Sequence, residues 1–315
     1  MLYRENIYHK NFAAMGTRFE LVLIGISPEY SQKIYNLIEK EVLRIELKLT
    51  RFSHTSVISE LNQNAGEMPV SVDNEVIEIV ELCKKYTDLT LGSFDITLLP
   101  LTLFWQIKTA DQNMQEWEYN EKISEILKIT GMSNVDIDPS NNTIFLRYPG
   151  MGIDLGGFGK GYALERVRKI LVSNAIENAF ISFGESSVLG LGHHPYGDSW
   201  KVGIQNLFDV NKSAYTFSII DSALSTSGIS GPINQRCFSG KSHIIDIDTG
   251  RPVKNLETVS VKSYSPVKAE VLSTALFAAD SKKRKKILKN FTGCEAVEIR
   301  YTEDDRNINI ISLNN

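Results

Sequence analysis

The stretch that decides the fold reads DLGGFGKGYALERV and covers residues 154–167. Four glycines and a lysine precede a run with helical spacing of apolar residues, which predicts a turn entering a helix over 159–175. Clustered glycines let a backbone approach a ligand closely, and the amides at a helix start favour an anion. A tight strand-to-helix turn explains the same glycines, so the pattern alone leaves both interpretations open. The run matches neither a Walker loop nor a dinucleotide-binding GxGxxG.

Around this stretch, helical and strand-like patterns are interspersed along the chain. Helices are predicted over 27–52, 56–66, 73–90, 120–131, 159–175 and 266–280. Strands are predicted over 18–25, 178–192, 200–206, 214–221, 222–228, 242–247, 258–265 and 296–304, with strand, turn and strand over 142–157. No linker rich in Pro, Gly or Ser marks a boundary. We therefore expect an α+β fold with mixed or antiparallel sheets and packed helices, as one unit over 1–315, with two lobes as the alternative.

Composition narrows the function classes. The 315 residues are 42% hydrophobic and 23% charged with a net charge of -4, so a basic nucleic-acid face is not expected. The basic run KKRKK at 282–286 is typical of a solvated helix face, with a polyanion or nuclear-localisation patch as the alternative. No apolar stretch approaches the ~20 residues of a membrane span. The start of the chain lacks an apolar signal core and a cysteine for a lipid, so we expect a cytoplasmic protein.

Cysteines give no framework for the fold. The three, Cys83, Cys237 and Cys294, are scattered and form no CxxC pattern. A disulfide scaffold or a cysteine zinc site is therefore not expected.

A second polar stretch, SHIIDIDTGRPV at 242–253, places His243 near two aspartates and a glycine turn. The DTG triplet occurs without the second copy that an aspartic protease needs. A histidine in a predicted strand is either a structural hydrogen-bonding residue or a catalytic one, and the stretch alone does not decide between them.

Two further patterns contain isolated acids. In KAEVLSTALF at 268–277, Glu270 and Thr274 stand four residues apart and share one helix face. Carboxylate and hydroxyl oxygens suit Mg²⁺, although a surface acid and a Thr bonded to the preceding turn give the same pattern. In LGSFDITLLPL at 91–101, Asp95 lies in an apolar run and needs hydrogen-bond partners if buried. It is either a site residue or a structural cap.

These patterns occur together in an order that resembles the ApbE family, the FAD:protein FMN transferases. The segments that carry the resemblance are AAMGTRFE, LTRFSHTSVISELNQNAG, GSFDITLLPL, DLGGFGKGYALERV, STSG, HIIDIDTGRPV and KAEVLSTAL. The resemblance covers residues from about 12 to about 280. Each segment is weak by itself, but their conjunction is specific.

The resemblance implies an enzyme that binds FAD with Mg²⁺, splits the diphosphate, releases AMP and joins FMN to a Thr or Ser of a target protein. An acceptor-like Asp-x-x-Thr-Gly-Ala-Thr motif is absent from the chain, so we expect the acceptor to be another protein. Two alternatives stay open. One is a Mg²⁺-dependent FAD pyrophosphatase, in which water replaces the acceptor, and the other is a catalytically silent flavin-binding protein.

The resemblance also implies roles for individual residues. His243 falls where the family has the histidine that activates the acceptor hydroxyl. The positions that match flavin contacts are Met15, Phe52, Ser93, Phe94, Asp95, Asp154, Lys160 and Ile245. The positions that match Mg²⁺ ligands are the backbone carbonyl of Gly157 and the side chains of Glu270 and Thr274.

The chain departs from the family pattern in two places. Glu270 stands where the family usually has Asp, and the extra methylene changes the reach of the carboxylate, so Mn²⁺ is an alternative to Mg²⁺. The segment ISFGESSVLGLG at 181–192 replaces the usual glycine-glycine-asparagine turn, which brings Glu185 and Ser186 to a place of expected ligand contacts.

Overall fold

The computed structural model describes residues 6–108, 115–228, 244–254, 256–302 and 306–314. Its helices are α1 (Pro28–Leu49), α2 (Val57–Gln63), α3 (Asn74–Leu89), α4 (Leu99–Lys108), α5 (Glu116–Ile129), α6 (Gly159–Ser173), α7 (Pro266–Ala278) and α8 (Ser281–Leu288), with 3₁₀ turns η1 (Ile96–Leu98) and η2 (Met132–Asn134). Its strands are β1 (Ile7–Ala14), β2 (Thr17–Ile24), β3 (Val70–Ser71), β4 (Val135–Asp138), β5 (Thr143–Leu146), β6 (Asn178–Phe183), β7 (Ser187–Leu191), β8 (Trp200–Gln205), β9 (Ser213–Ile219), β10 (Ser222–Gly228), β11 (Ile245–Asp246), β12 (Arg251–Pro252), β13 (Glu257–Ser263), β14 (Cys294–Thr302) and β15 (Asn307–Ser312). The predicted α+β class with antiparallel sheets is confirmed.

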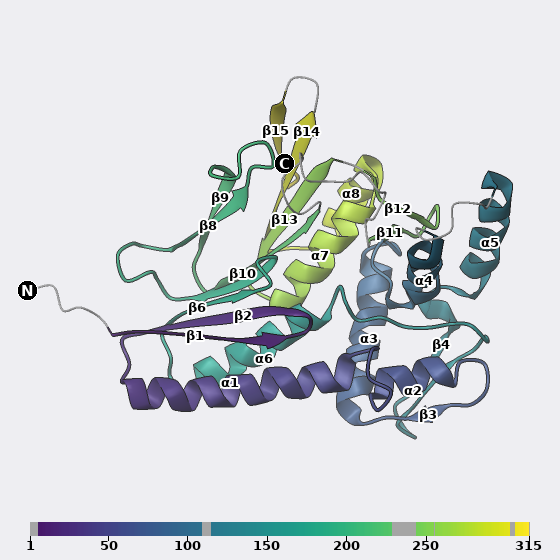
Figure 1. Cartoon of the computed structure of the whole chain (residues 1–315), viewed down its shortest axis with the longest axis horizontal. Coiled ribbons are helices and arrows are strands. Elements are labelled where there is room, and N and C mark those ends of the chain that lie inside the picture. The colour runs from purple at the N-terminus through teal and green to yellow at the C-terminus, as the bar shows by residue number, and fades with distance from the viewer. Residues whose placement is uncertain (1–5, 109–114, 229–243, 255, 303–305, 315) are drawn as a thin grey trace, which may run out of the picture.

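The largest sheet has eight strands in the order β1-β2-β6-β7-β10-β13-β14-β15, and every neighbouring pair is antiparallel. Helices α1, α6 and α7 pack together along one face, as Figure 1 shows. The β8–β9 hairpin covers part of the opposite face. Strand β2 serves both sides, because Phe19 and Leu21 face the helices while Ile24 belongs to the cluster under the hairpin.

A smaller region contains helices α2 to α5 and the three-stranded sheet β3-β5-β4 (Figure 1). Its apolar residues join those of the large sheet in one buried cluster, which includes Ile58, Val76 and Ile144 together with Phe19 and Leu21. The smaller region is therefore packed directly onto the helix-covered side of the large sheet.

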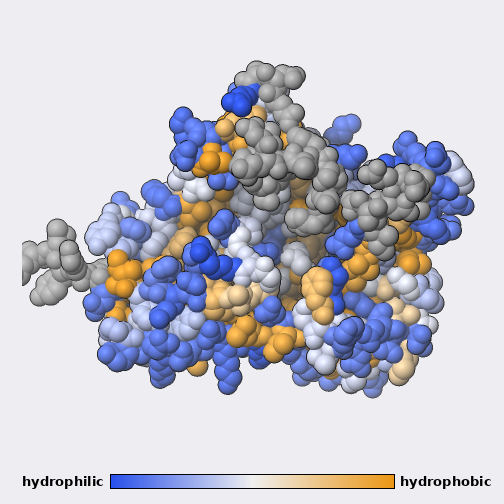
Figure 2. Space-filling view, viewed as in Figure 1, coloured by the Kyte–Doolittle hydropathy of each residue, from blue (hydrophilic) through white to orange (hydrophobic). Residues whose placement is uncertain are grey.

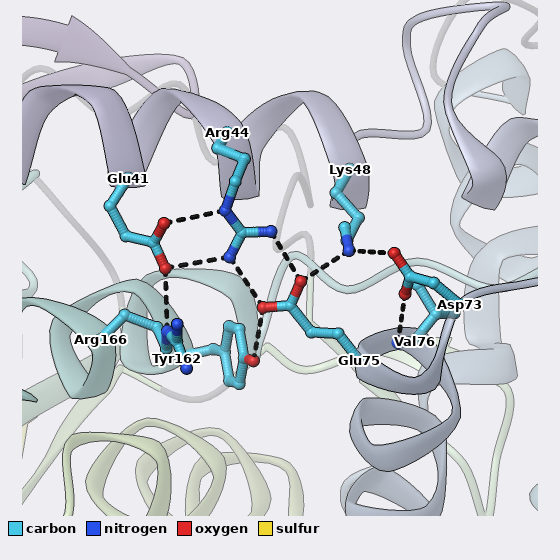
Figure 3. A network of polar contacts seen from close by, with 8 residues as sticks. All are labelled: Glu41, Arg44, Lys48, Asp73, Glu75, Val76, Tyr162 and Arg166. Carbon is cyan, nitrogen blue, oxygen red and sulfur yellow. Dashed lines mark hydrogen bonds and ion pairs between the residues drawn. The ribbon is translucent and has the colours of Figure 1, made fainter.

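A network of ion pairs ties α1, α3 and α6 together (Figure 3). Arg44 on α1 bonds to Glu75 on α3 through two nitrogens, at 2.6 and 2.8 Å, and the Tyr162 hydroxyl on α6 donates to the same carboxylate at 2.9 Å. Arg166 on α6 pairs with Glu41 on α1 at 2.8 Å. The hydrogen bonds from Arg44, aided by those from neighbouring donors, hold the pKa of Glu75 well below its usual range. The network fixes the first turns of α6, where the glycine stretch ends.

The surface is mainly polar. On the face shown in Figure 2, hydrophilic residues predominate and apolar residues form separate small groups. Within the described part of the chain, none of the helices combines the length and the apolar character needed to cross a membrane.

The structure corrects the predicted second strand within 142–157. Residues 151–155 form no strand, because the side chain of Asn62 satisfies the backbone there in place of a neighbouring strand. Its carbonyl oxygen accepts from the amide of Ile153 at 2.7 Å, and its amide donates to the Ile153 carbonyl at 3.0 Å. The predicted strand at 242–247 shrinks to the two described residues of β11, and His243 lies outside the described residues.

The basic run at 282–286 is only partly a solvated face. Arg284 is buried, where its guanidinium pairs with Glu257 and, at 3.1 Å, with Glu298. Lys285 and Lys286 on the same helix are exposed, as expected. One residue of the run therefore belongs to the interior of the protein.

Candidate active site

The predicted site residues gather around one cavity of about 470 Å³, which lies between the start of α6, one face of α7, strand β10 and the turn before η1. Cavities of this size bind small ligands and cofactors. The predicted residues that line it are Ser93, Phe94, Asp95, Asp154, Gly157, Lys160, Ile245, Glu270 and Thr274. Segments that are far apart in the sequence thus form a single pocket.

Two glycines of the opening stretch have separate physical roles. A Cβ on Gly161 would lie 2.9 Å from the Pro266 carbonyl oxygen and 3.1 Å from the Glu270 Cβ, so glycine lets α6 pack closely on α7. A Cβ on Gly157 would lie within 3.7 Å of the Thr274 hydroxyl, on the cavity wall. The glycines therefore serve both helix packing and access to the pocket.

No side chain caps the N-terminus of α6 at Phe158. The amides of Phe158 and Gly159 donate to the Leu155 carbonyl, and the partial positive charge of the helix start attracts anions. This helix start lies beside Gly156, Gly157 and Lys160 in the cavity wall. The arrangement suits a phosphate group in the cavity.

Glu270 is the buried acid of the site. Only 4% of its side chain is exposed, and both carboxylate oxygens have partners. Oε1 lies 3.0 Å from Lys160 Nζ, and Oε2 accepts from Ser187 Oγ at 3.3 Å. The lysine supplies the opposite charge that a buried carboxylate requires.

A chain of hydroxyl groups extends along the cavity from Glu270. The Thr274 hydroxyl lies 3.3 Å from that of Ser227, which lies 3.1 Å from that of Ser273. Ser273 also contacts the Ser225 hydroxyl and donates to the Glu270 carbonyl, at 3.1 and 3.0 Å. This face of α7 therefore offers a carboxylate and a hydroxyl one turn apart, as the spacing predicted.

Asp154 forms a second polar centre with a residue that sequence reasoning missed. Its Oδ2 accepts from Arg51 Nε at 2.8 Å, and its Oδ1 accepts from the amide of Gly156 at 2.9 Å. Arg51 lines the cavity, and its guanidinium lies 4.1 Å from the Phe52 ring centre. Arg51 directly precedes Phe52, which the resemblance places at the flavin. A cation next to an expected flavin contact is the signal in the sequence that could have identified Arg51 as a site residue.

The carboxylate of Asp95 accepts three hydrogen bonds from the protein itself. Its Oδ1 accepts from the amide and the hydroxyl of Thr97 at 2.8 and 2.6 Å, and its Oδ2 accepts from the amide of Met132 at 3.1 Å. Burial raises the pKa of this carboxyl. Asp95 caps η1 and also lines the cavity. The two interpretations from the sequence, a structural cap and a site residue, are therefore compatible.

Two other predicted residues do not line the cavity. The Phe52 side chain is 78% exposed beside Arg51. Met15 lies one layer behind the glycine turn, because a Cβ on Gly159 would lie 3.8 Å from the Met15 sulfur. Ile244, which directly follows His243 in the chain, does line the cavity together with Ile245.

Comparisons with known proteins agree with this geometry. The family model described as the ApbE family matches residues 15–297. The chain belongs to the ApbE family. An FAD:protein FMN transferase of Klebsiella pneumoniae is 25% identical over 300 residues, which are 95% of this chain and 90% of that protein. One from Chlamydia pneumoniae is 26% identical and covers 84% of this chain and 83% of its own.

Solved ApbE structures share the fold. The ApbE protein of Thermotoga maritima superposes with a TM-score of 0.78 at 26% identity and covers 96% of each chain. The flavin transferase ApbE from Vibrio cholerae gives a TM-score of 0.80 at 24% identity, covering 98% of this chain and 97% of that chain. The mixed α and β architecture is therefore that of ApbE proteins.

The donor set suits a Mg²⁺ ion in this ApbE chain. The described residues contain no cluster of three or more His, Cys, Asp and Glu side chains, so an all-carboxylate or histidine metal centre is not formed by them. Glu270 and Thr274 instead line one cavity with hard oxygen donors, and Gly157 lies beside Thr274 on its wall. Mg²⁺ in proteins is typically held by one or two carboxylates, with water and substrate phosphates completing its shell.

Proposed function

We propose that the protein is an FAD:protein FMN transferase, which moves FMN from FAD to a Thr or Ser hydroxyl of a target protein and releases AMP. The observation that carries the proposal is the meeting of the glycine turn, Lys160 and the acid face of α7 at one cavity. Membership of the ApbE family and the names of the similar proteins support the same activity.

The diphosphate of FAD is the group that best matches the start of α6. The positive end of the α6 dipole and the Lys160 ammonium provide positive charge for its oxygens. Arg51 adds a second cation from the other side of the turn. Phosphoryl transfer depends mainly on such positioning and electrostatic stabilisation.

Glu270, Thr274 and the Gly157 carbonyl would hold a Mg²⁺ ion beside the diphosphate. A bound metal ion withdraws charge from the phosphoryl oxygens and stabilises the departing phosphate of AMP. Ser187 would keep the Glu270 carboxylate oriented, since its hydroxyl already donates to Oε2. Thr274 is held in place by Ser227 through the hydroxyl contact.

We assign the proton transfer to His243. In the proposed step the acceptor oxygen forms a bond to the phosphorus of the FMN half, its proton passes to the histidine, and the bond to AMP breaks. A histidine with a pKa near neutrality suits this role. The position of Ile244 and Ile245 on the cavity wall supports the assignment, because His243 precedes them directly.

The test is an incubation of the purified protein with FAD and Mg²⁺, with and without an acceptor protein that carries the Asp-x-x-Thr-Gly-Ala-Thr motif. We expect AMP release together with covalent flavin on the acceptor, detected by in-gel fluorescence and mass spectrometry. AMP and free FMN without labelled acceptor would instead support the FAD pyrophosphatase. FAD binding without any AMP release would support the silent flavin-binding protein and overturn the proposal.

A further inference from the structure

The contact between Lys160 and Glu270 carries a further inference, which rests on the proposed metal site. Both residues were expected to meet different parts of the ligand, the lysine the flavin nucleotide and the acid the metal ion. In the structure they pair with each other at 3.0 Å. Both expected roles therefore draw on groups that already form an ion pair with each other.

A metal ion at Glu270 would share its carboxylate with Lys160. The Lys160 ammonium lies at hydrogen-bond distance from Oε1, while Ser187 donates to Oε2. A Mg²⁺ ion sits about 2.0–2.1 Å from its oxygen ligands. An ammonium group at hydrogen-bond distance from the same carboxylate would then lie close to a doubly charged cation in a site with little solvent. Repulsion between the two cations favours departure of the lysine.

The side chain of Lys160 can move while its helix stays in place. The neighbouring Gly161 packs against the backbone of α7, where a Cβ would lie 3.0 Å from the Val267 Cα. Tyr162, the next residue, is held by Glu75 at 2.9 Å. The lysine has four methylene groups, and 23% of its side chain is exposed, so its ammonium can turn within the cavity while α6 stays in place.

We propose that Lys160 is an exchangeable counter-ion that neutralises Glu270 until a divalent cation binds there. On metal binding, the ammonium leaves the carboxylate and turns to the phosphate oxygens of the ligand in the same cavity. Lys160 is thus a positioning residue that couples metal binding to the binding of an anion. The exchange keeps the buried carboxylate paired throughout, which avoids the cost of an isolated buried charge.

The test measures Mn²⁺ binding without FAD, by electron paramagnetic resonance of the free ion, because this readout does not depend on activity. We expect Lys160→Met to bind Mn²⁺ at least tenfold more tightly than the wild type, since no cation competes for Glu270. Lys160→Arg keeps the charge and should bind no more tightly than the wild type. Lys169→Met is the matched control, because Lys169 lies on the same helix with an exposed side chain.

A second measurement uses the wild-type protein and therefore does not depend on the folding of a variant. Acetylation of Lys160 relative to Lys169, followed by mass spectrometry, should rise when Mn²⁺ is added. Equal Mn²⁺ affinity of wild type and Lys160→Met, or labelling of Lys160 that Mn²⁺ leaves unchanged, would overturn the inference. AMP release in the separate FAD assay would then still support the proposed function. Conversely, tighter Mn²⁺ binding in a protein that releases no AMP would support the exchange and overturn the activity.

Discussion

Arg51 Nε donates a hydrogen bond to Asp154 Oδ2 at 2.8 Å and joins the segment after α1 to the glycine turn before α6. The other oxygen of the same carboxylate accepts from the Gly156 amide. Asp154 therefore holds a cation on one side and the backbone of the turn on the other. A ligand phosphate at this turn would meet a backbone that is already ordered, which reduces the entropic cost of binding.

We expect Arg51→Met to weaken FAD binding by about tenfold, or about 1.4 kcal/mol, because the turn loses one anchor and the cavity loses a cation. Flavin fluorescence titration measures the change. Asp154→Asn should weaken binding as well, and the double variant should lose less than the sum, because both changes remove the same contact. Arg18→Met is a control, since this arginine pairs with Glu20 on β2 and is 62% exposed. Strictly additive losses would show that the pair does not act as a unit.

Asp95→Asn should destabilise the protein by about 1–3 kcal/mol at neutral pH, measured by urea unfolding. The carboxylate accepts three hydrogen bonds, from two donors of Thr97 and from the Met132 amide. An asparagine keeps one acceptor but turns an amide donor toward one of these donors. Thr102→Val removes a hydroxyl from the same cavity that donates to the Leu98 carbonyl, at the end of η1, and should cost less.

The same variant tests a pH dependence. Burial raises the folded-state pKa of Asp95 above its ordinary value of 3.8, so the folded protein takes up this proton before the unfolded chain does. The contribution of Asp95 to stability is therefore largest at acid pH and falls as pH rises through the folded pKa. The stability difference between wild type and Asp95→Asn should grow as pH is lowered toward 4. A difference that shrinks over that interval would contradict the raised pKa.

Helical periodicity brought two residues of the candidate site together. The spacing of Glu270 and Thr274 correctly placed both on one face of α7. The glycines of 156–161 predicted a close approach to a ligand, whereas the close approach that Gly161 makes is to α7. The partners of these groups were not predictable. Arg51 lies 103 residues from Asp154 and Lys160 lies 110 residues from Glu270, so only the packed tertiary structure brings them together.

The same limit explains the missed elements of the fold. Residues 7–14 and 307–312 are strands at the two edges of the large sheet. Polar residues interrupt the apolar pattern of 7–14, whereas the alternation N-I-N-I at 307–310 does signal the second strand. Residues 151–155 resemble a strand because Met151, Ile153 and Leu155 alternate, but the Asp154 amide bonds to Ile96 instead of a neighbouring strand.

The charge run at 282–286 gives a third prediction. Arg284→Met should destabilise the protein by about 3–5 kcal/mol, because it leaves the buried carboxylates of Glu257 and Glu298 with less compensation. Lys285→Met removes a charge from the exposed face of the same helix and should change stability by less than about 0.5 kcal/mol. Thermal unfolding of both variants provides the comparison. Similar effects of the two substitutions would mean that the run acts only through its total charge.

The last prediction concerns Glu270, which stands where the resemblance to the ApbE family implies an aspartate. Glu270→Gln preserves the shape of the side chain but removes its charge, so Mg²⁺-dependent AMP release should fall at least about 100-fold, or about 2.7 kcal/mol. Thr274→Val should cost less, because a hydroxyl is a weaker ligand than a carboxylate.

Glu270→Asp tests how the length of the acidic side chain affects metal binding and the ion pair with Lys160. The shorter side chain gives the aspartate that the resemblance implies and also withdraws from Lys160 and Ser187, the two partners of Glu270 in the structure. We expect this variant to keep or raise turnover with Mg²⁺, whose geometry is strict, and the wild type to gain from Mn²⁺, which tolerates less regular distances. AMP release is measured across both ions, with EDTA as the blank. Full activity in EDTA, or in Glu270→Gln, would remove the metal ion from the proposed mechanism, because no other carboxylate of α7 is available to replace Glu270.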